Sequence, residues 1–398
     1  MTEIAANPSP PTMPSYADMI IVGGGLAGLI AALGLARTGK QIIHLSPLAP
    51  TDMRTSALME PSVAILQQLD LLSDPNEIGE PLVKIRLIDA TSRLLRAPEA
   101  LFDSSEAGVQ AFGWNFANMR LSKKMVSLIK SYKNLRQIPL TAIKMKKKNH
   151  AWETTLADGS KIQAPLLIGA DGKKSFVRKN SNIVIKLQKH AQSALVCDLS
   201  LERPLEGESV EYHYENGPFT FVPAGGNKAN LVWVDDGKSL EEITRLSASE
   251  IQSILQKKSQ NLFGKLTLET PTVVFPLSSH HVNEMGRNGV VLVGESGHAF
   301  PPIGAQGLNL SLRDIAQLIE LTEAADINNP DWANIVSREY SRKRHMDIIR
   351  TNRMVDSLFK TLLCDYLPSQ LIRTGGMWAL KSIAPLRKHA FEMGMGQL

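Results

Sequence analysis

A glycine-rich turn near the start of the chain, set between two apolar runs, constrains the fold more than any other feature. Residues 18–22 are mostly apolar, as in a buried parallel strand, and residues 26–37 are rich in Ala and Leu and predict a helix. A second strand is expected over residues 41–45, which completes a β-α-β unit. The turn before the helix carries glycines at the spacing of a dinucleotide-binding loop. These glycines are Gly23, Gly25 and Gly28.

Each glycine of the turn has its own physical role. Gly23 permits the tight turn, Gly25 lets the backbone approach a pyrophosphate, and Gly28 lets helix and strand pack closely. Leu26 and Ala27 open the helix, whose N-terminal amides and positive dipole end would face the phosphates. We therefore predict a dinucleotide site here; the alternative is a glycine-rich turn without a ligand.

The end of the second predicted strand lacks the residue expected there. An acidic side chain about 20 residues after the turn usually holds the ribose hydroxyls. This sequence has Ser46 at that position, with His44 nearby. A serine hydroxyl can hydrogen-bond a ribose only singly and without charge, which weakens binding by about 1–2 kcal/mol if nothing compensates.

A second segment of interest lies in the middle of the chain. Residues 163–168 predict a strand that leads into Gly169-Ala170-Asp171-Gly172, and a helix is expected to begin within residues 173–178. From the residues alone, Asp171 either contacts a ligand together with Gly172 or caps the following helix. Both interpretations stay open at this point.

A third segment follows an apolar strand expected over residues 288–293. Gly294-Glu295 end this strand, and the run Pro301 to Asn309 is the most specific stretch of the chain. Its prolines and glycines make a rigid, thin backbone that can lie flat against a ring. The helix that opens at Gly307 would favour an electron-rich, anionic group at its N-terminus.

Two histidine positions were considered as reactive groups. His298 is a weak candidate for a proton relay, because a lone histidine after a strand more often packs or caps. His280-His281 lacks a partner acid at metal-ligand spacing, so no metal site is expected. Cys197 and Cys364 also lack such spacing and are expected to be inert thiols.

Length and charge limit the class of protein. A chain of 398 residues predicts two lobes or more, and no apolar run is long enough for a transmembrane helix. The net charge of +5 comes from residues 331–398, which hold 11 Lys and Arg against 6 Asp and Glu. This excess is either a solvated helical face or a basic surface for anionic lipid or an acidic partner. No nucleic-acid-binding motif accompanies it.

Taken together, the three segments resemble those of one family. The chain is similar to the UbiH/Coq group of ubiquinone-biosynthesis hydroxylases, within the class A FAD-dependent monooxygenases, over about residues 18–396. The third segment matches the group's Pro-Ile-Gly-Ala-Gln-Gly-Leu-Asn signature, with Ser311 where glycine is usual and Glu295 where the group has Asp. Smaller matching pieces are Arg54 with Ala57-Leu58 and Ser62, Phe112-Gly113-Trp114-Asn115 with Asn118, Gln192 with Ala194-Leu195, Gly217-Pro218-Phe219 with Pro223, and Trp233.

The resemblance implies an α/β fold with three parts. These are a discontinuous, Rossmann-like FAD-binding domain, an antiparallel β-sheet substrate domain with an apolar pocket, and a C-terminal helical region. Alternating stretches within residues 181–276 agree with such a sheet. The expected divisions are a disordered leader (1–15), FAD-binding parts (16–80, 111–180 and 277–330), substrate-domain parts (81–110 and 181–276) and C-terminal helices (331–398).

The resemblance also implies FAD as cofactor and NAD(P)H and O2 as co-substrates. Asp171 is then expected near both the flavin pyrophosphate and the nicotinamide path, and Arg54 near the pyrophosphate or ring; a surface salt bridge is the alternative for Arg54. No metal and no defined catalytic acid or base is implied. The residues expected to bind FAD are Gly23, Gly25, Leu26, Ala27, Gly28, Ser46, Arg54, Asp171, Gly172, Gly294, Glu295, Pro302, Gly304, Ala305, Gln306, Gly307, Leu308 and Asn309.

The implied activity is hydroxylation of a polyprenylated phenol on the route to ubiquinone, with the ring position left open. A cytoplasmic location is expected, with possible partners among other ubiquinone-biosynthesis proteins and a possible peripheral contact with the inner face of the membrane. Two other functions stay open. One is a different flavin oxidoreductase of the same fold, although the Trp-x-Trp-x-Ile segment of halogenases is absent. The other is a non-catalytic scaffold.

A membrane or partner contact would use the apolar residues of the C-terminal region. The alternative is that these residues pack back on the FAD-binding domain. The residues concerned are Leu362, Leu363, Leu367, Leu371, Ile372, Met377, Trp378 and Leu380.

Overall fold

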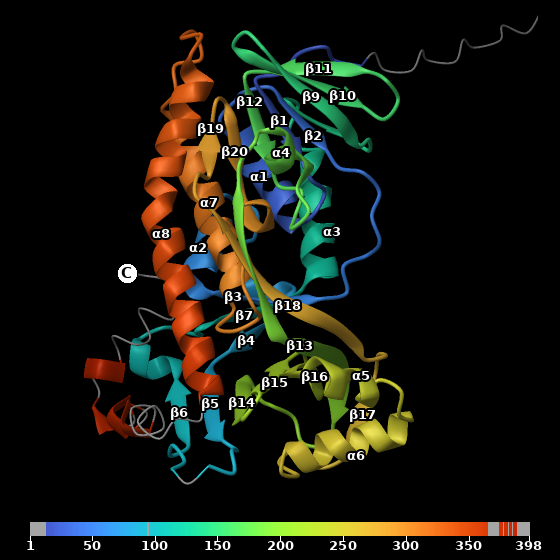
Figure 1. Cartoon of the computed structure of the whole chain (residues 1–398), viewed down its shortest axis with the longest axis vertical. Helices are drawn as coiled ribbons and strands as arrows, with labels where there is room; N and C mark the ends of the chain where they lie inside the picture. Colours follow the sequence, from blue (N-terminus) through green and yellow to red (C-terminus); the bar gives the residue numbers. More distant parts are fainter. Residues whose placement is uncertain are drawn as a thin grey trace, which may run out of the picture.

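The apolar runs around the first glycine turn form the middle of a parallel sheet (Figure 1). The computed structural model describes residues 13–93, 95–364, 374–376, 378–380, 382–383 and 385–387. Within them, the central sheet has the order β19-β20-β12-β1-β2-β8, parallel throughout except for β19. Its strands are β1 (Met19–Val22), β2 (Ile42–Leu45), β8 (Leu135–Ile138), β12 (Leu166–Gly169), β19 (Gly286–Arg287) and β20 (Val290–Leu292).

Helices cover this sheet because its strands are buried on both faces. Every residue of β1, β2, β12 and β20 is buried, as expected for parallel strands between helical layers. Helix α1 lies in contact with α3 and α7, and α7 contacts α8. The helices of this lobe are α1 (Leu26–Ala36), α2 (Glu60–Gln68), α3 (Asn118–Ile129), α4 (Phe176–Asn180), α7 (Gln306–Glu323) and α8 (Trp332–Leu363), with the 3-10 turns η1 (Pro75–Glu77) and η3 (Gly294–Ser296).

The prediction of a single strand over residues 163–168 is wrong. Two strands occupy this stretch, β11 (Lys161–Ala164) and β12, and Pro165 separates them. Proline has no backbone N–H to donate to a neighbouring strand, so the ladder breaks there. Strand β11 instead pairs with β10 (Ala151–Leu156), which pairs with β9 (Ala142–Lys148) in a separate antiparallel sheet.

A second large sheet forms the other lobe, as the sequence predicted. Its described path is β21-β18-β13-β16-β15-β14-β5-β6, with β17 paired to β13. All its pairs are antiparallel except β5 with β14, which are parallel. The strands are β5 (Lys84–Asp89), β6 (Ala100–Asp103), β13 (Ile185–Leu201), β14 (Glu208–Tyr214), β15 (Gly217–Pro223), β16 (Lys228–Asp236), β17 (Leu266–Leu268), β18 (Val273–Val282) and β21 (His298–Ala299).

Aromatic packing fills one face of this second sheet. Phe219 packs edge-on against Phe221 and Trp233, with ring centroids 5.1 and 5.6 Å apart. The buried Tyr212 donates its hydroxyl hydrogen bond to the carbonyl of Ser259 (2.9 Å), which ties the sheet to the end of α6. The elements around this core are α5 (Gly237–Ile243), α6 (Ala248–Lys258) and η2 (Ser104–Ala107).

Three long elements join the two lobes. Strands β13 and β18 run side by side from the central-sheet lobe into the second sheet, and their register shifts between Lys189 and Ser193 (Figure 1). Helix α8 runs along both lobes on one side of the molecule. Near its start Tyr340 donates to the carbonyl of Leu292 (2.8 Å), and near its end Phe359 packs against the buried Leu277 and Val234.

A small sheet of three strands, named the third sheet below, lies between the central sheet and the second sheet in Figure 1 and contacts α2, α3 and α7. It has the order β3-β7-β4, and its strands are β3 (Thr55–Met59), β4 (Gly79–Leu82) and β7 (Gly113–Ala117). Among the described helices, none is long and apolar enough to span a membrane. Of the predicted leader, residues 1–12 lie outside the described part. Ser15 belongs to the fold, because its carbonyl accepts a hydrogen bond from the Gln163 amide (2.9 Å).

The apolar residues named above in the C-terminal region differ in their surroundings. Leu363 and Leu380 pack against buried clusters, and Trp378 is exposed. The alternative that this region packs back on the FAD-binding domain holds for part of α8, which contacts α7 and the central sheet, whereas Leu363 and Leu380 lie in clusters that include residues of the second sheet. The side chain of Leu362 and the residues Leu367, Leu371, Ile372 and Met377 lie outside the described part.

The crossing of α1 over β1 offers a direct test of the fold. A Cβ atom on Gly28 would stand 1.9 Å from the Gly23 carbonyl oxygen, whereas one on Gly25 would meet nothing within 4 Å. We expect Gly28→Ala to lower the free energy of unfolding by about 3 kcal/mol, because the added methyl group would force the backbone of α1 away from the backbone of Gly23. Urea unfolding measures this loss of stability. Gly25→Ala is the matched control and should unfold like the wild type; equal losses in both variants would contradict the assigned crossing.

Candidate functional site

The three glycine-containing segments meet where β1, β12 and β20 end. Gly23 has a φ of +131°, and a Cβ atom there would lie 2.1 Å from the Ala170 carbonyl oxygen, so the first turn presses directly on the second segment. The third segment joins them through Gly169, whose carbonyl accepts hydrogen bonds from the Val293 amide (2.9 Å) and the Ser296 hydroxyl (2.5 Å). Ligands of open α/β sheets bind outside the carboxyl ends of the strands, which is where this junction lies.

Helix α1 begins at this junction with its amides uncapped. No side chain caps it, no acidic residue lies in its first turn, and the space where a side chain on Gly25 would stand is open. The unsatisfied amides and the dipole make this end a favourable place for a phosphate. Ser46 lies beside the turn at the end of β2, with its hydroxyl oxygen 2.5 Å from the position of a Cβ on Gly24.

His44 lies under the turn instead of facing a ribose. It is fully buried, and its Nε2 donates to the Gly23 carbonyl oxygen (2.8 Å). Burial lowers the pKa of His44, so the imidazole is neutral and the Nε2 proton is free for this bond. His44 therefore holds the tight turn in place.

Helix α7 also begins uncapped, at the end of the proline-glycine run. Gly304 and Ala305 both have left-handed backbone conformations, with φ of +63° and +53°. Ala305 pays a steric cost for this conformation, which Asn309 offsets by donating to the Ala305 carbonyl oxygen (2.5 Å). Gln306 donates to the Gly304 carbonyl oxygen (2.9 Å). Two of the predicted cofactor residues, Gln306 and Asn309, thus shape the loop with their side chains.

Asn309 also ties this loop to the start of the third sheet. Its Oδ1 accepts from the Met59 amide (2.8 Å) and its Nδ2 donates to the Ala57 carbonyl oxygen (2.9 Å). Pro302, Gly304 and Gly307 are exposed. The loop therefore offers a thin, accessible backbone on a rigid support, as the sequence predicted for a surface that faces a flat ring.

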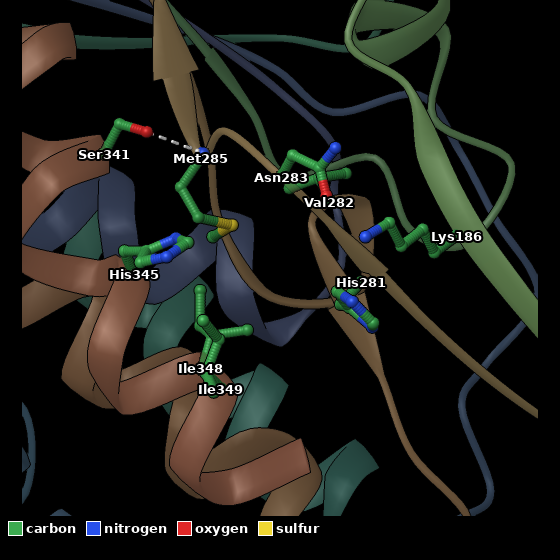
Figure 2. A pocket seen from close by; sticks show the side chains of 9 residues that line it. All are labelled: Lys186, His281, Val282, Asn283, Met285, Ser341, His345, Ile348 and Ile349. Carbon is green, nitrogen blue, oxygen red and sulfur yellow. Dashed lines mark hydrogen bonds between the residues drawn. The ribbon is translucent and has the colours of Figure 1, made fainter. Parts of the chain in front are cut away.

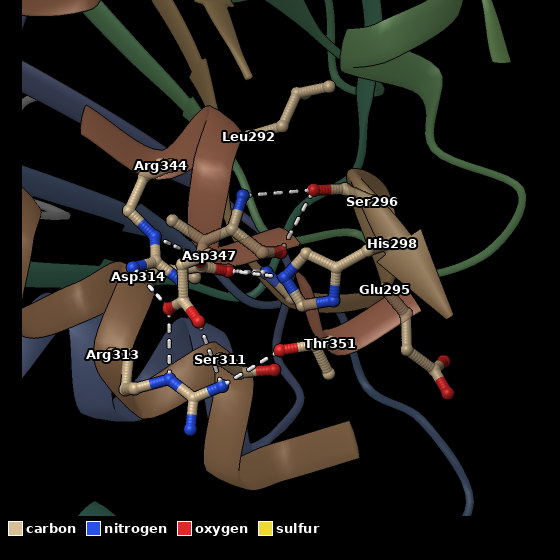
Figure 3. Close-up of polar contacts among 12 residues, drawn as sticks. Leu292, Glu295, Ser296, His298, Ser311, Arg313, Asp314, Arg344, Asp347 and Thr351 are labelled. Atoms are coloured by element: carbon tan, nitrogen blue, oxygen red, sulfur yellow. Dashed lines mark hydrogen bonds and ion pairs between the residues drawn. The ribbon is translucent and has the colours of Figure 1, made fainter. Parts of the chain in front are cut away.

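A buried ion-pair network supports the turn at Gly294 from behind (Figure 3). Asp314, fully buried on α7, accepts from the Gly294 amide (3.0 Å), from His298 Nε2 (2.6 Å) and from Arg344 Nε on α8 (2.8 Å). Arg344 also pairs with Asp347 (2.7 Å). Burial alone raises the pKa of Asp314, but the interactions with His298 and Arg344 outweigh it and hold that pKa below its ordinary value.

His298 belongs to this network and not to the surface of the site. It is 1% exposed, so its imidazole does not reach a substrate. The side chain of Glu295 points away from the network in Figure 3 and is partly exposed. Its carbonyl oxygen accepts from His280 Nε2 (2.9 Å), and burial lowers the pKa of His280 to about 4.

Asp171 makes the contacts of a cap at the start of α4, and its contact with the cofactor stays a prediction. Its carboxylate accepts hydrogen bonds from the Ser175 hydroxyl and from the amides of Phe176 (2.6 Å) and Val177 (3.0 Å) at the start of α4. Gly172 next to it has a φ of +76°. Arg178 in the same helix is buried and donates to the carbonyl oxygen of Ser296 (2.5 Å).

Arg54 makes the salt bridge that was the alternative for it. Its guanidinium forms two bonds with Asp52, at 2.8 and 2.9 Å, and its side chain is 64% exposed. Hydrogen bonding to Asp52 is the main cause that raises the pKa of Arg54, and the charge of Glu295 adds to it. Arg54 and Glu295 are therefore close enough to interact at the mouth of the site. Asn118 completes this corner by donating to Asp52 (2.9 Å).

Neither Asp314, the centre of the site's support, nor its partner Arg344 is among the residues predicted from the sequence. A signal for Asp314 was present, because it stands four residues after Leu310 and four before Leu318 on the buried stripe of α7. An acid at such a position needs a buried partner. The identity of that partner, 30 residues further along the chain, could not be read from the pattern.

The arrangement fits an elongated dinucleotide with a flat ring. Helices α1 and α7, which contact each other, both begin uncapped, at Gly25 and Ala305, and glycines leave room for backbone contacts at both ends. The FAD binding domain family matches residues 16–325, which is most of the chain. The protein belongs to the FAD binding domain family. FAD is the cofactor of this FAD-binding protein, and NAD(P)H is the co-substrate typical of its class.

Proteins that match almost the whole chain are similar to it in sequence. The FAD-binding protein is 27% identical to the ubiquinone hydroxylase UbiL of Rhodospirillum rubrum, over 99% of this chain and 93% of that protein. It is 25% identical to the 3-demethoxyubiquinol 3-hydroxylase of Escherichia coli, over 95% of this chain and 98% of that protein. These are similarities of sequence over whole chains.

Solved structures share the fold. The p-nitrophenol 4-monooxygenase PnpA of Pseudomonas putida superposes with a TM-score of 0.78 and 18% identity, over 97% of this chain and 100% of that chain. PqsL of Pseudomonas aeruginosa, solved in complex with 2-aminobenzoylacetate, gives a TM-score of 0.78 with 19% identity, over 91% of this chain and 99% of that chain. The two-lobed architecture predicted from the sequence is thus that of known flavin monooxygenases.

Removal of the central carboxylate should be costly. Asp314→Asn keeps the side-chain shape but leaves Arg344 short of a buried counter-charge, so we expect the free energy of unfolding to fall by about 3 kcal/mol. Urea unfolding of the FAD-bound protein measures this loss. Asp347→Asn is the control, because that carboxylate is 28% exposed and its loss should cost about 1 kcal/mol or less. Equal losses would contradict the central role of Asp314.

The difference in unfolding free energy between the wild type and Asp314→Asn should depend on pH. Because the pKa of folded Asp314 lies below the ordinary value of 3.8, its contribution is complete at neutral pH and is lost as pH falls through the lower, folded-state value. The difference between wild type and Asp314→Asn should therefore be constant from pH 7 to about pH 5 and narrow below pH 4. A difference that narrows already near pH 6 would contradict this assignment.

A separate prediction concerns the ribose position. We expect Ser46→Glu to tighten FAD binding about tenfold, since a carboxylate can accept two ribose hydroxyl bonds where serine forms one. Fluorescence titration of the FAD-free protein with FAD measures the affinity. Ser46→Gln has the same length without the charge and should gain less. Unchanged or weaker binding of Ser46→Glu would count against Ser46 as the ribose contact.

Proposed function

We propose that this protein is an FAD-dependent aromatic ring hydroxylase that uses NAD(P)H and O2 and acts on a polyprenylated phenol in ubiquinone biosynthesis. One observation carries the proposal. Relatives that match nearly the whole chain are hydroxylases of ubiquinone and demethoxyubiquinol by name. The convergence of three segments on one FAD site supports it, because the chain keeps the cofactor site that such a reaction needs.

Each part of the site has a definite task in this proposal. Bound FAD would supply electron transfer from NAD(P)H and the activation of O2. The uncapped amides of α1 would hold the pyrophosphate, and those of α7 would favour negative charge on the ring. Glu295 and Arg54 would contact the cofactor from the mouth of the site. Asp314 and His298 act behind the turn and position it.

An apolar wall beside the proline-glycine run suits a prenylated ring. Ile303 in that run is buried together with Leu277 and Val234 of the second sheet and with Phe359 of α8. Such a wall would exclude water from the reacting atoms, which protects an oxygen-activating cofactor from unproductive peroxide release. A phenol is electron-rich enough to accept an oxygen atom without a protein acid or base, which agrees with the burial of His298.

Contacts with other ubiquinone-biosynthesis proteins and with a membrane belong to the same proposal. Trp378, Ile383 and Leu386 are exposed large apolar side chains in the C-terminal region. Such residues next to basic ones are typical of peripheral contact surfaces. A cytoplasmic enzyme that docks in this way would reach a substrate with a long hydrocarbon tail.

Reconstitution and turnover test the proposal. The purified protein should be yellow or take up added FAD, and a prenylated phenol should raise its rate of NAD(P)H oxidation at least severalfold and yield a hydroxylated product. A prenylated benzene of equal chain length is the control substrate, and it should give no product because it lacks the activating hydroxyl.

Two results would contradict the proposal. A colourless protein that cannot take up FAD would favour the scaffold alternative. An FAD-loaded protein that oxidises NAD(P)H at the same rate with both compounds, and forms no hydroxylated product, would favour another flavin oxidoreductase.

A further inference from the structure

A cavity away from the FAD site lies between the start of β13, the end of β18 and α8 (Figure 2). It encloses about 120 Å³, several times the roughly 30 Å³ that one water occupies in the liquid. Its floor is apolar and includes Val282, Met285 and Ile348. The Met285 amide donates to the Ser341 hydroxyl oxygen (3.0 Å), which fixes the turn after β18 to α8 and leaves the hydroxyl proton free to donate.

The rim of this cavity is basic. Lys186 and His281 stand on one side of it, and His345 on α8 stands across from them in Figure 2. Lys186 makes no hydrogen bond or ion pair with any other described residue. Among the described residues, no carboxylate lines the cavity. Burial is the main cause that lowers the pKa of His281, and the positive charge of Lys186 lowers it further, so Lys186 and His281 lie close enough to interact.

A second, wider depression of about 620 Å³ adjoins this cavity and shares Ser341 and His345 with it. It adds three arginines, Arg287, Arg338 and Arg342. Each of the three has a carboxylate partner. Glu284, which also lines the depression, lies 3.8 Å from Arg287, and Glu339 lies 2.9 Å from Arg342 and 4.0 Å from Arg338. Exposed pairs of this kind are weak, so the guanidinium groups remain available to a ligand.

We propose that the cavity and the depression together form a binding site for a ligand that carries a phosphate group. The phosphate would lie between Lys186, His281 and His345, with Ser341 as a neutral donor. Ammonium, imidazole and hydroxyl groups around one enclosed space supply the donors that phosphate oxygens accept. The apolar floor and the arginine-lined depression would take the rest of the ligand. The site does not depend on the proposed hydroxylase activity.

Phosphate groups of three sources fit this chemistry, and binding measurements distinguish them. The FAD-bound protein is titrated with inorganic phosphate, with NADPH and NADH, and with phosphatidylcholine vesicles that contain or lack phosphatidylglycerol. Calorimetry gives the affinities for the soluble probes, and co-sedimentation gives vesicle binding. Preference for NADPH over NADH indicates a nucleotide phosphate, binding only to the anionic vesicles indicates a lipid headgroup, and binding of phosphate alone indicates the free ion.

Variants tie the binding to this cavity. Lys186→Ala/His281→Ala and, separately, His345→Ala should weaken whichever probe binds by about tenfold or more. Lys189→Ala is the matched control, an exposed lysine on the same strand outside the cavity, and should bind as the wild type does. FAD content and the urea midpoint confirm that each variant is folded.

The proposal is overturned if no probe binds the wild type, or if both cavity variants bind every probe as tightly as the wild type and Lys189→Ala. Since the readout is binding and not turnover, a protein that binds phosphate here but hydroxylates nothing would contradict only the proposed function. A protein that hydroxylates its phenol and shows no phosphate binding would contradict only this site.

Discussion

The buried carboxylate of Asp314 is the interaction on which the FAD site depends most. It receives the Gly294 amide, His298 and Arg344 in a region without access to water, where an unpaired charge would cost several kcal/mol. Because its three partners come from the turn after β20, from β21 and from α8, the carboxylate fixes three chain segments at once. Because Asp314 holds the amide of Gly294, it also fixes the position of the next residue, Glu295.

Close backbone contact is the second constraint. Gly28 allows α1 to lie close to the Gly23 carbonyl, and Gly23 allows the first turn to lie against Ala170. A single methyl group at either position would meet a carbonyl oxygen at about 2 Å. These contacts bring the first and second segments together, and Gly169 joins the third to them through its carbonyl oxygen. Segments that are more than 100 residues apart in sequence therefore meet at the carboxyl ends of the central strands. Family membership and the whole-chain relatives agree with this assembly.

Helix α8 connects the site to the remainder of the molecule. Its Arg344 reaches Asp314, its Phe359 closes the apolar wall near Ile303, and its Ser341 and His345 border the basic cavity on the opposite side of the network. Helix α8 therefore contributes residues both to the support of the FAD site and to the proposed phosphate site.

The sequence by itself determined the β-α-β unit, the order of the three segments and the two-lobed architecture, because glycine spacing and strand periodicity are local properties of the chain. It also predicted the alternatives for Asp171 and Arg54 but could not choose between them, since both choices use the same residue types. Only the tertiary structure decided that Asp171 caps α4, that Pro165 splits one predicted strand into two, and that His298 is enclosed. The partner of a buried charge is set by packing between elements that are distant in sequence. Asp314 pairs with Arg344 on α8, and the sequence pattern of that helix does not indicate this ion pair.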